Sequence, residues 1–186
     1  SQLIEKLSSF QIYLTREKLG ELCGKFLSSE EMTNWITKKY SSDKEDYLQE
    51  DWTWTCLTVL WERWYGHIPN FEMLDDKMQL GYHLRYDEKK YAEACDVWLG
   101  AWRDVVYLSE KGKFGSIDEF DDRFRGTQSL FNWCQDFEME LSNGGVHDKK
   151  YYGERIKYCE EFINLFPHED QSVIGNMQRA IAESYF

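Results

Sequence analysis

The sequence predicts an all-α protein, and three observations support this prediction. Apolar residues recur at spacings of three and four residues in one segment after another, as in Tyr91, Ala94 and Trp98, which is the spacing of a helix face. No segment shows the sustained alternation of apolar and polar residues that a half-buried strand needs. A hydrophobic content of 42% and an aromatic content of 17% are sufficient for a core. We expect antiparallel helical hairpins, stacked as a solenoid or packed as a compact bundle.

The first helices are expected to be short. Residues 1–40 contain two or three of them, because Gly20 and Gly24 interrupt an amphipathic pattern at a cost in helix stability. Ser28 or Ser29 then caps the next helix, and Glu30 and Glu31 in its first turn complement the helix dipole.

A long helix is predicted over residues 46–65. Trp54, Leu57 and Trp61 lie at spacings of three and four in this segment. Gly66 and Pro69 stop it, because glycine favours a helix C-terminus and proline lacks the N–H that a continuing helix needs.

The clearest hairpin comes next in the chain. Asn70 caps a helix over residues 71–85, and a turn at 87–90 leads into a helix over 91–108. Small residues such as Gly81 allow the two backbones to approach closely.

End signals also divide the C-terminal part. Ser116 and Glu119 form a capping-box pattern for a short helix. The next helix, over residues 130–141, is expected to end at the Ser-Asn-Gly-Gly run of residues 142–145. Further helices are predicted over 152–166, which Pro167 ends, and over 173–185.

The chain is expected to form one domain over residues 1–186. Only two prolines occur, and the twelve glycines are scattered, so no linker separates two bodies. The best candidate for a subdivision lies near 111–116, which would divide N-terminal hairpins in 1–110 from C-terminal hairpins in 116–186.

The charge disfavours two classes of partner. A net charge of −12 and a pI near 4.8 oppose broad binding to nucleic acid or to an anionic membrane and mildly favour a basic protein or peptide. A solvated acidic surface explains the same charge. No apolar run is long enough to span a membrane and no signal peptide is recognised, so we expect a cytoplasmic protein. Five cysteines without a CxxC motif fit small buried side chains in a reducing compartment.

The hairpin resembles the tetratricopeptide repeat. Leu80 and Gly81 match its first helix, and the second helix is matched by an aromatic, Ala, aromatic and Ala at the expected spacings, namely Tyr91, Ala94, Trp98 and Ala101. Lys77 and Leu84 depart from the pattern. The resemblance implies a right-handed solenoid of helical hairpins.

A second, partial match lies at the C-terminus, where Pro167 precedes Ile181, Ala182 and Tyr185. It is similar to bacterial proteins in which tetratricopeptide-like helices precede a SEC-C metal-binding motif. The Cys-rich motif itself is absent from this sequence, so no metal ligand is carried over. A region that positions such a motif beyond Phe186 stays an alternative.

The resemblance implies a non-catalytic interaction or scaffold module that binds a partner protein or peptide, without a cofactor. In this family the first helix of each unit lines a concave groove. The corresponding residues of the central unit are Asp75, Met78, Tyr82, Arg85 and Tyr86, and those of the terminal unit are Asn176, Arg179, Glu183 and Phe186. Packing of Met78 and Tyr82 against a neighbouring hairpin is the alternative to a place in the groove.

Two other clusters have alternative interpretations. Tryptophans at 52, 54, 61 and 64 form either core or an aromatic cage for a cationic ligand. The run of Asp118, Glu119, Asp121 and Asp122 forms either a helix first turn or a divalent-cation site, and the latter would indicate an α-helical metal-dependent enzyme. His67, His83, His147 and His168 lack metal-ligand spacing, and no phosphate loop or nucleophile motif occurs, so we do not expect catalysis.

Overall fold

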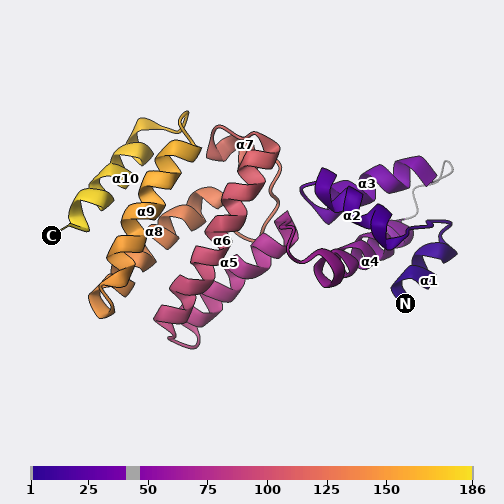
Figure 1. The fold of residues 1–186 in the computed structure, drawn as a ribbon, viewed down its shortest axis with the longest axis horizontal. Coiled ribbons are helices and arrows are strands. Elements are labelled where there is room, and N and C mark those ends of the chain that lie inside the picture. The colour runs from indigo at the N-terminus through magenta and orange to yellow at the C-terminus, as the bar shows by residue number, and fades with distance from the viewer. Residues whose placement is uncertain (1, 41–46, 186) are drawn as a thin grey trace. The chain divides into compact units, whose positions relative to one another are not determined.

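The prediction of an all-α fold is confirmed. The computed structural model describes residues 2–40 and 47–185, where every regular element is a helix (Figure 1). The helices are α1 (Gln2–Ser9), α2 (Arg16–Lys25), α3 (Ser29–Tyr40), α4 (Tyr47–Tyr65), α5 (Phe71–Tyr86), α6 (Tyr91–Gly112), α7 (Ile117–Asp121), α8 (Leu130–His147), α9 (Lys150–Leu165) and α10 (Gln171–Glu183).

The chain divides into two compact units, Ser1–Met73 and Leu74–Phe186, and the boundary falls in the first turn of α5. Residues 113–116 form the turn between α6 and α7, inside the second unit. The single domain over 1–186 and the subdivision near 111–116 stay predictions. None of the described helices combines the length and the apolar character needed to cross a bilayer.

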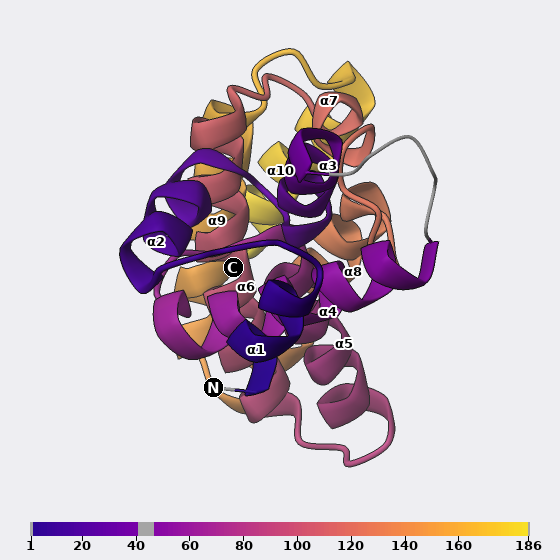
Figure 2. The ribbon, with the colours of Figure 1, turned by 90° about the vertical axis from the view of Figure 1, so that its right-hand side faces the viewer.

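In the first unit, α1, α2 and α3 pack on the long helix α4 (Figure 2). Trp61 of α4 is fully buried, and its indole Nε1 donates a hydrogen bond to the carbonyl of Ile68 at 2.9 Å. Of the two serines expected to cap α3, Ser28 is the cap, because its hydroxyl accepts a hydrogen bond from the amide of Glu31 at 2.9 Å. The core consists of Leu7, Ile12, Leu19, Leu22, Cys23, Met32, Ile36, Cys56, Leu57, Leu60 and Trp61.

In the second unit, α5 and α6 form the predicted hairpin, and α8 and α9 form another. Helix α8 packs on α6, α7 and α9, and α10 packs on α9. Large rings fill the core, as when the ring centroids of Trp98 and Trp133 lie 6.0 Å apart in a T-shaped contact. The predicted cap of α5 is confirmed by residues of the first unit, since the amide of Met73 donates to the side chain of Asn70 at 2.8 Å.

The expected end of the helix before residues 142–145 is wrong. Helix α8 continues through both glycines to His147. A Cβ at Gly144 would lie 3.0 Å from Cys95 Sγ, and one at Gly145 would lie 2.4 Å from a ring carbon of Tyr152. These glycines therefore admit neighbouring side chains rather than terminate the helix.

Candidate functional site

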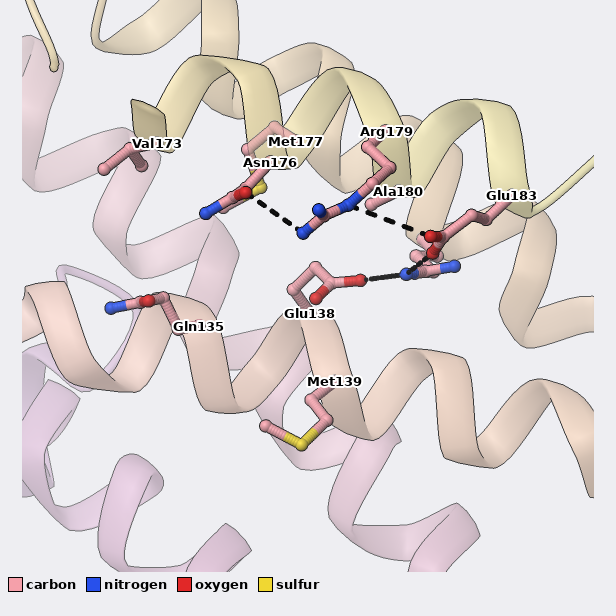
Figure 3. Close-up of a pocket in the computed structure, with 10 residues that line it drawn as sticks. Gln135, Glu138, Met139, Val173, Asn176, Met177, Arg179, Ala180 and Glu183 are labelled. Carbon is pink, nitrogen blue, oxygen red and sulfur yellow. Dashed lines mark hydrogen bonds and ion pairs between the residues drawn. The ribbon is translucent and has the colours of Figure 1, made fainter. Parts of the chain in front are cut away.

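Three of the predicted groove residues, Asn176, Arg179 and Glu183, line one cavity of about 350 Å³ (Figure 3). They project from α10 toward α8, which forms the opposite wall. The other residues of the lining are Gln135, Glu138 and Met139 from α8, Arg155 from α9, and Val173, Met177 and Ala180 from α10.

A buried arginine joins the three helices around this cavity. Arg155 is only 6% exposed. Its guanidinium pairs with Glu138 of α8 and donates to Glu183 Oε2 and Ser184 Oγ, each at 3.1 Å. A buried charge is tolerated only when such partners replace its water. Arg155 therefore fixes the separation of α8 and α10, and with it the width of the cavity.

The polar rim of the cavity is more loosely held. Arg179 Nη2 donates to Asn176 Oδ1 at 3.0 Å, and Arg179 Nε lies 3.8 Å from Glu183 Oε1 (Figure 3). Both Arg179 and Glu183 have largely exposed side chains, so this ion pair contributes little to stability. The guanidinium of Arg179 can therefore exchange its present partners for those of a ligand at a small cost.

The remaining surface of the cavity is apolar. Val173, Met177 and Ala180 are buried side chains of α10, whereas Met139 of α8 is 55% exposed. An exposed methionine beside polar groups suits the binding of an apolar side chain, because its flexible thioether adapts to different shapes. The arrangement offers an apolar anchor site with hydrogen-bonding groups at its rim.

Comparisons with protein-family models, with curated proteins and with solved structures find no match. The function of the chain is therefore inferred from the geometry of its sites.

The predicted residues of the central unit make contacts within the protein. Tyr82 of α5 donates a hydrogen bond to Asp136 of α8 at 2.6 Å. Burial, together with this hydrogen bond, raises the pKa of the Tyr82 phenol well above its ordinary value. Asp75 accepts hydrogen bonds from the amide and the hydroxyl of Thr127, both at 2.9 Å. These two side chains hold α5 to the segments that come after α7.

Arg85 and Tyr86 lie near the C-terminal end of α5. Arg85 Nε donates to Glu140, whose carboxylate is buried in α8, and the guanidinium stacks 4.3 Å from the ring centroid of Tyr91. Tyr86 is 63% exposed and stacks on Tyr82. Tyr86 is thus the member of the central set with the most surface free for a partner.

Met78 requires a correction. Its side chain is fully buried, and its carbonyl accepts a hydrogen bond from Trp98 Nε1 at 3.0 Å. The expectation that Met78 faces a groove is therefore not met, because its side chain is part of the core. Phe186 lies outside the described residues.

The acidic run has a capping role. Asp121 accepts hydrogen bonds from the amides of Leu130 and Phe131 at the start of α8, and Glu119 accepts one from Gly115. Ser116 caps α7 as predicted. Within residues 2–40 and 47–185, no group of three histidines, cysteines or carboxylates is placed to hold a metal ion.

The sequence pattern did not identify the part of the site that comes from α8 and α9. In the sequence, Arg155 resembles an ordinary charged residue on the polar face of an amphipathic helix. Its burial depends on the packing of α10 over this face. One usable signal existed: Gln135 and Met139 are four residues apart on the polar side of α8, and a methionine there is an exception to the helix pattern.

Proposed function

We propose that the second unit is a non-catalytic, tetratricopeptide-like module that binds a partner peptide along α8 and α10. One observation carries the proposal: residues expected in the groove, Asn176, Arg179 and Glu183, line a cavity with an exposed methionine on the opposite wall. The cavity volume of about 350 Å³ is in the range of sites that accept a side chain or a small ligand.

The order of the helices supports this proposal. Helix α8 contacts α5 through Asp136 and shares the cavity with α10. The first helices of successive hairpins therefore lie next to one another, which is what the resemblance to a tetratricopeptide repeat implies. A peptide that crosses α8 would reach Tyr86 on one side of this helix and Arg179 on the other, because Arg85 bonds Glu140 and the cavity of Arg179 is lined by Glu138 and Met139.

The charges of this surface support a basic partner. Asp75 and Asp136 are bonded to neutral donors, Thr127 and Tyr82, and no Lys, Arg or His side chain of the described residues pairs with them. A carboxylate without a cation attracts a basic ligand over the range of a Debye length. We therefore propose a peptide with an apolar anchor for the cavity and basic residues toward α5.

A selection experiment tests the proposal. A phage-displayed library of random peptides is selected on the full chain, and the enriched peptides are titrated against a Met139→Ala/Arg179→Ala double variant. Both side chains are exposed, so the fold is preserved. We expect shared basic and apolar positions, and binding weakened at least about tenfold by the double variant, since anchor contacts contribute about 1–2 kcal/mol or more.

The control is Lys157→Ala, which removes an exposed cation of α9 outside the cavity. Its affinity should match that of the wild-type protein. Failure to enrich any peptide, or equal affinity for the double variant and the wild type, would remove the basis for the proposal.

A further inference from the structure

A second cavity lies in the first unit, between α3 and α4. Its volume is about 340 Å³, and its walls are Glu30, Thr33 and Asn34 of α3 with Glu50, Asp51 and Trp54 of α4. Thr33 is buried and Trp54 is 43% exposed. The cavity therefore has a closed floor and one large aromatic wall that is open to solvent.

The ring of Trp54 differs from its neighbours. Other indoles of this unit carry a cation of the chain itself over their faces, namely Lys6 at 4.9 Å from the ring of Trp52, Lys25 at 4.9 Å from that of Trp35, and Arg16 at 5.6 Å from that of Trp64. In the part of the chain that the structure describes, no cation lies over Trp54. Its edge is oriented instead, with Nε1 at 3.5 Å from Glu72 Oε1.

Glu72 explains why this orientation persists. Its carboxylate accepts hydrogen bonds from the amide and the hydroxyl of Ser29 and from the amide of Glu30, at the start of α3. Three donors satisfy both oxygens, so Glu72 is held in place by the helix end. The indole edge is directed toward this fixed group, which leaves the ring face as a wall of the cavity.

The charges around the ring face have one sign. Glu30, Glu50 and Asp51 line the cavity, and none of them is paired with a Lys, Arg or His side chain of the described residues. These carboxylates do not converge on a point, since the described residues include no cluster that could hold a metal ion. A cation that spans the cavity satisfies them better than a compact metal ion does.

We propose that this cavity binds an organic cation, an alkylammonium or guanidinium group, with its charge over the indole of Trp54 and its N–H donors directed to Glu30, Glu50 and Asp51. An aromatic face attracts such a cation through its quadrupole, and ionised acceptors strengthen the hydrogen bonds. The chemistry is shared by a free polyamine and by a lysine or arginine side chain of a partner. This proposal does not depend on the peptide site of the second unit.

The test uses the indole N–H signals of the ¹⁵N-labelled full chain. The probes are spermidine, a capped arginine dipeptide and, as an inorganic cation, Mg²⁺. We expect spermidine or the dipeptide to shift the Trp54 signal in a saturable way, and the comparison of the two identifies the source of the cation. Mg²⁺ is expected to leave the signal in place at equal ionic strength.

Trp52 supplies a matched control, because it lies on the same helix and is 44% exposed. Trp54→Leu should abolish saturable binding and Trp52→Leu should preserve it. Glu50→Gln/Asp51→Asn should weaken binding about fivefold or more, which corresponds to the loss of about 1 kcal/mol. This second variant keeps the ring, so it tests the site even if the leucine variant does not fold.

Three results would overturn the proposal. One is the absence of a Trp54 shift with either organic probe up to about 10 mM, tenfold above a millimolar Kd. Another is unchanged affinity in the Glu50→Gln/Asp51→Asn variant. The third is competition of Mg²⁺ for the same site with equal affinity, which would indicate a non-selective acidic surface.

Discussion

The indole of Trp98 occupies the space that a side chain at residue 81 would need. A Cβ built on Gly81 would lie 1.9 Å from Trp98 Nε1, and this nitrogen donates to the carbonyl of Met78 one turn away. The indole thus bonds to the backbone of α5 at the point where α5 has no side chain. The contact joins the two helices of the hairpin.

Gly81→Ala is expected to destabilise the protein by about 1–3 kcal/mol or more, because the added methyl group overlaps a buried ring that cannot move freely. Urea unfolding followed by circular dichroism measures the change. Gly100→Ala on α6 is the control, since nothing lies within 4 Å of its Cβ position. That variant should be as stable as the wild type or more stable, and equal losses in both variants would contradict the role of Trp98.

Arg85→Leu is expected to lower the free energy of unfolding by about 2–4 kcal/mol, because it leaves the buried carboxylate of Glu140 without its cation. Chemical denaturation measures this loss. The double variant Arg85→Leu/Glu140→Leu should recover much of it, since both charges are then absent. A double variant as unstable as the sum of the two single variants would show that the ion pair is not the cause.

Asp121→Ala is expected to cost about 1–2 kcal/mol, because two amides at the start of α8 lose their acceptor. Amide hydrogen exchange should become faster at Leu130 and Phe131. Asp122→Ala removes an exposed carboxylate next in the chain and should change stability by no more than about 0.5 kcal/mol. Equal effects of the two substitutions would argue against capping by Asp121.

Stability is expected to fall as the pH rises above about 9. Burial raises the pKa of the Cys95 and Cys159 thiols to about 12, from an ordinary value near 9. Above pH 9 the unfolded chain therefore releases protons that the folded chain keeps, and each such thiol lowers stability by up to about 1.4 kcal/mol per pH unit. Unfolding in urea at about pH 7 and about pH 10 measures this slope.

Cys159→Ala removes one of these titrating groups, so its stability should fall less steeply with pH than that of the wild type. A slope that is unchanged in this variant would show that the thiols are not responsible.

Helix positions could be predicted from sequence because apolar spacing and end signals are local. Asn70, Ser116 and Pro167 act where the pattern placed them, at the ends of α5, α7 and α9. The prediction that a helix ends at Gly144 and Gly145 was wrong because a glycine can either end a helix or leave room for the side chain of a neighbouring helix. The neighbours that decide between these roles, such as Cys95, lie far away in the chain.

The candidate site was also predictable only in part, because contacts between distant parts of the chain leave no local pattern in the sequence. Asn176, Arg179 and Glu183 share one face of one helix, so a single-helix pattern was sufficient to group them. Arg155 and Glu138 join them through packing between α8, α9 and α10, which no local pattern records. Met78 was misplaced because the burial of a helix face depends on which neighbour covers it.

The reactivity of the five buried cysteines can report the local opening of individual helices. Each is fully buried, and α2, α4, α6, α8 and α9 carry one apiece: Cys23, Cys56, Cys95, Cys134 and Cys159. A thiol reagent reacts with such a side chain only during excursions in which its helix leaves the core. Mass spectrometry of labelled peptides would therefore track each of these helices without an introduced probe, and would show whether the two units open together.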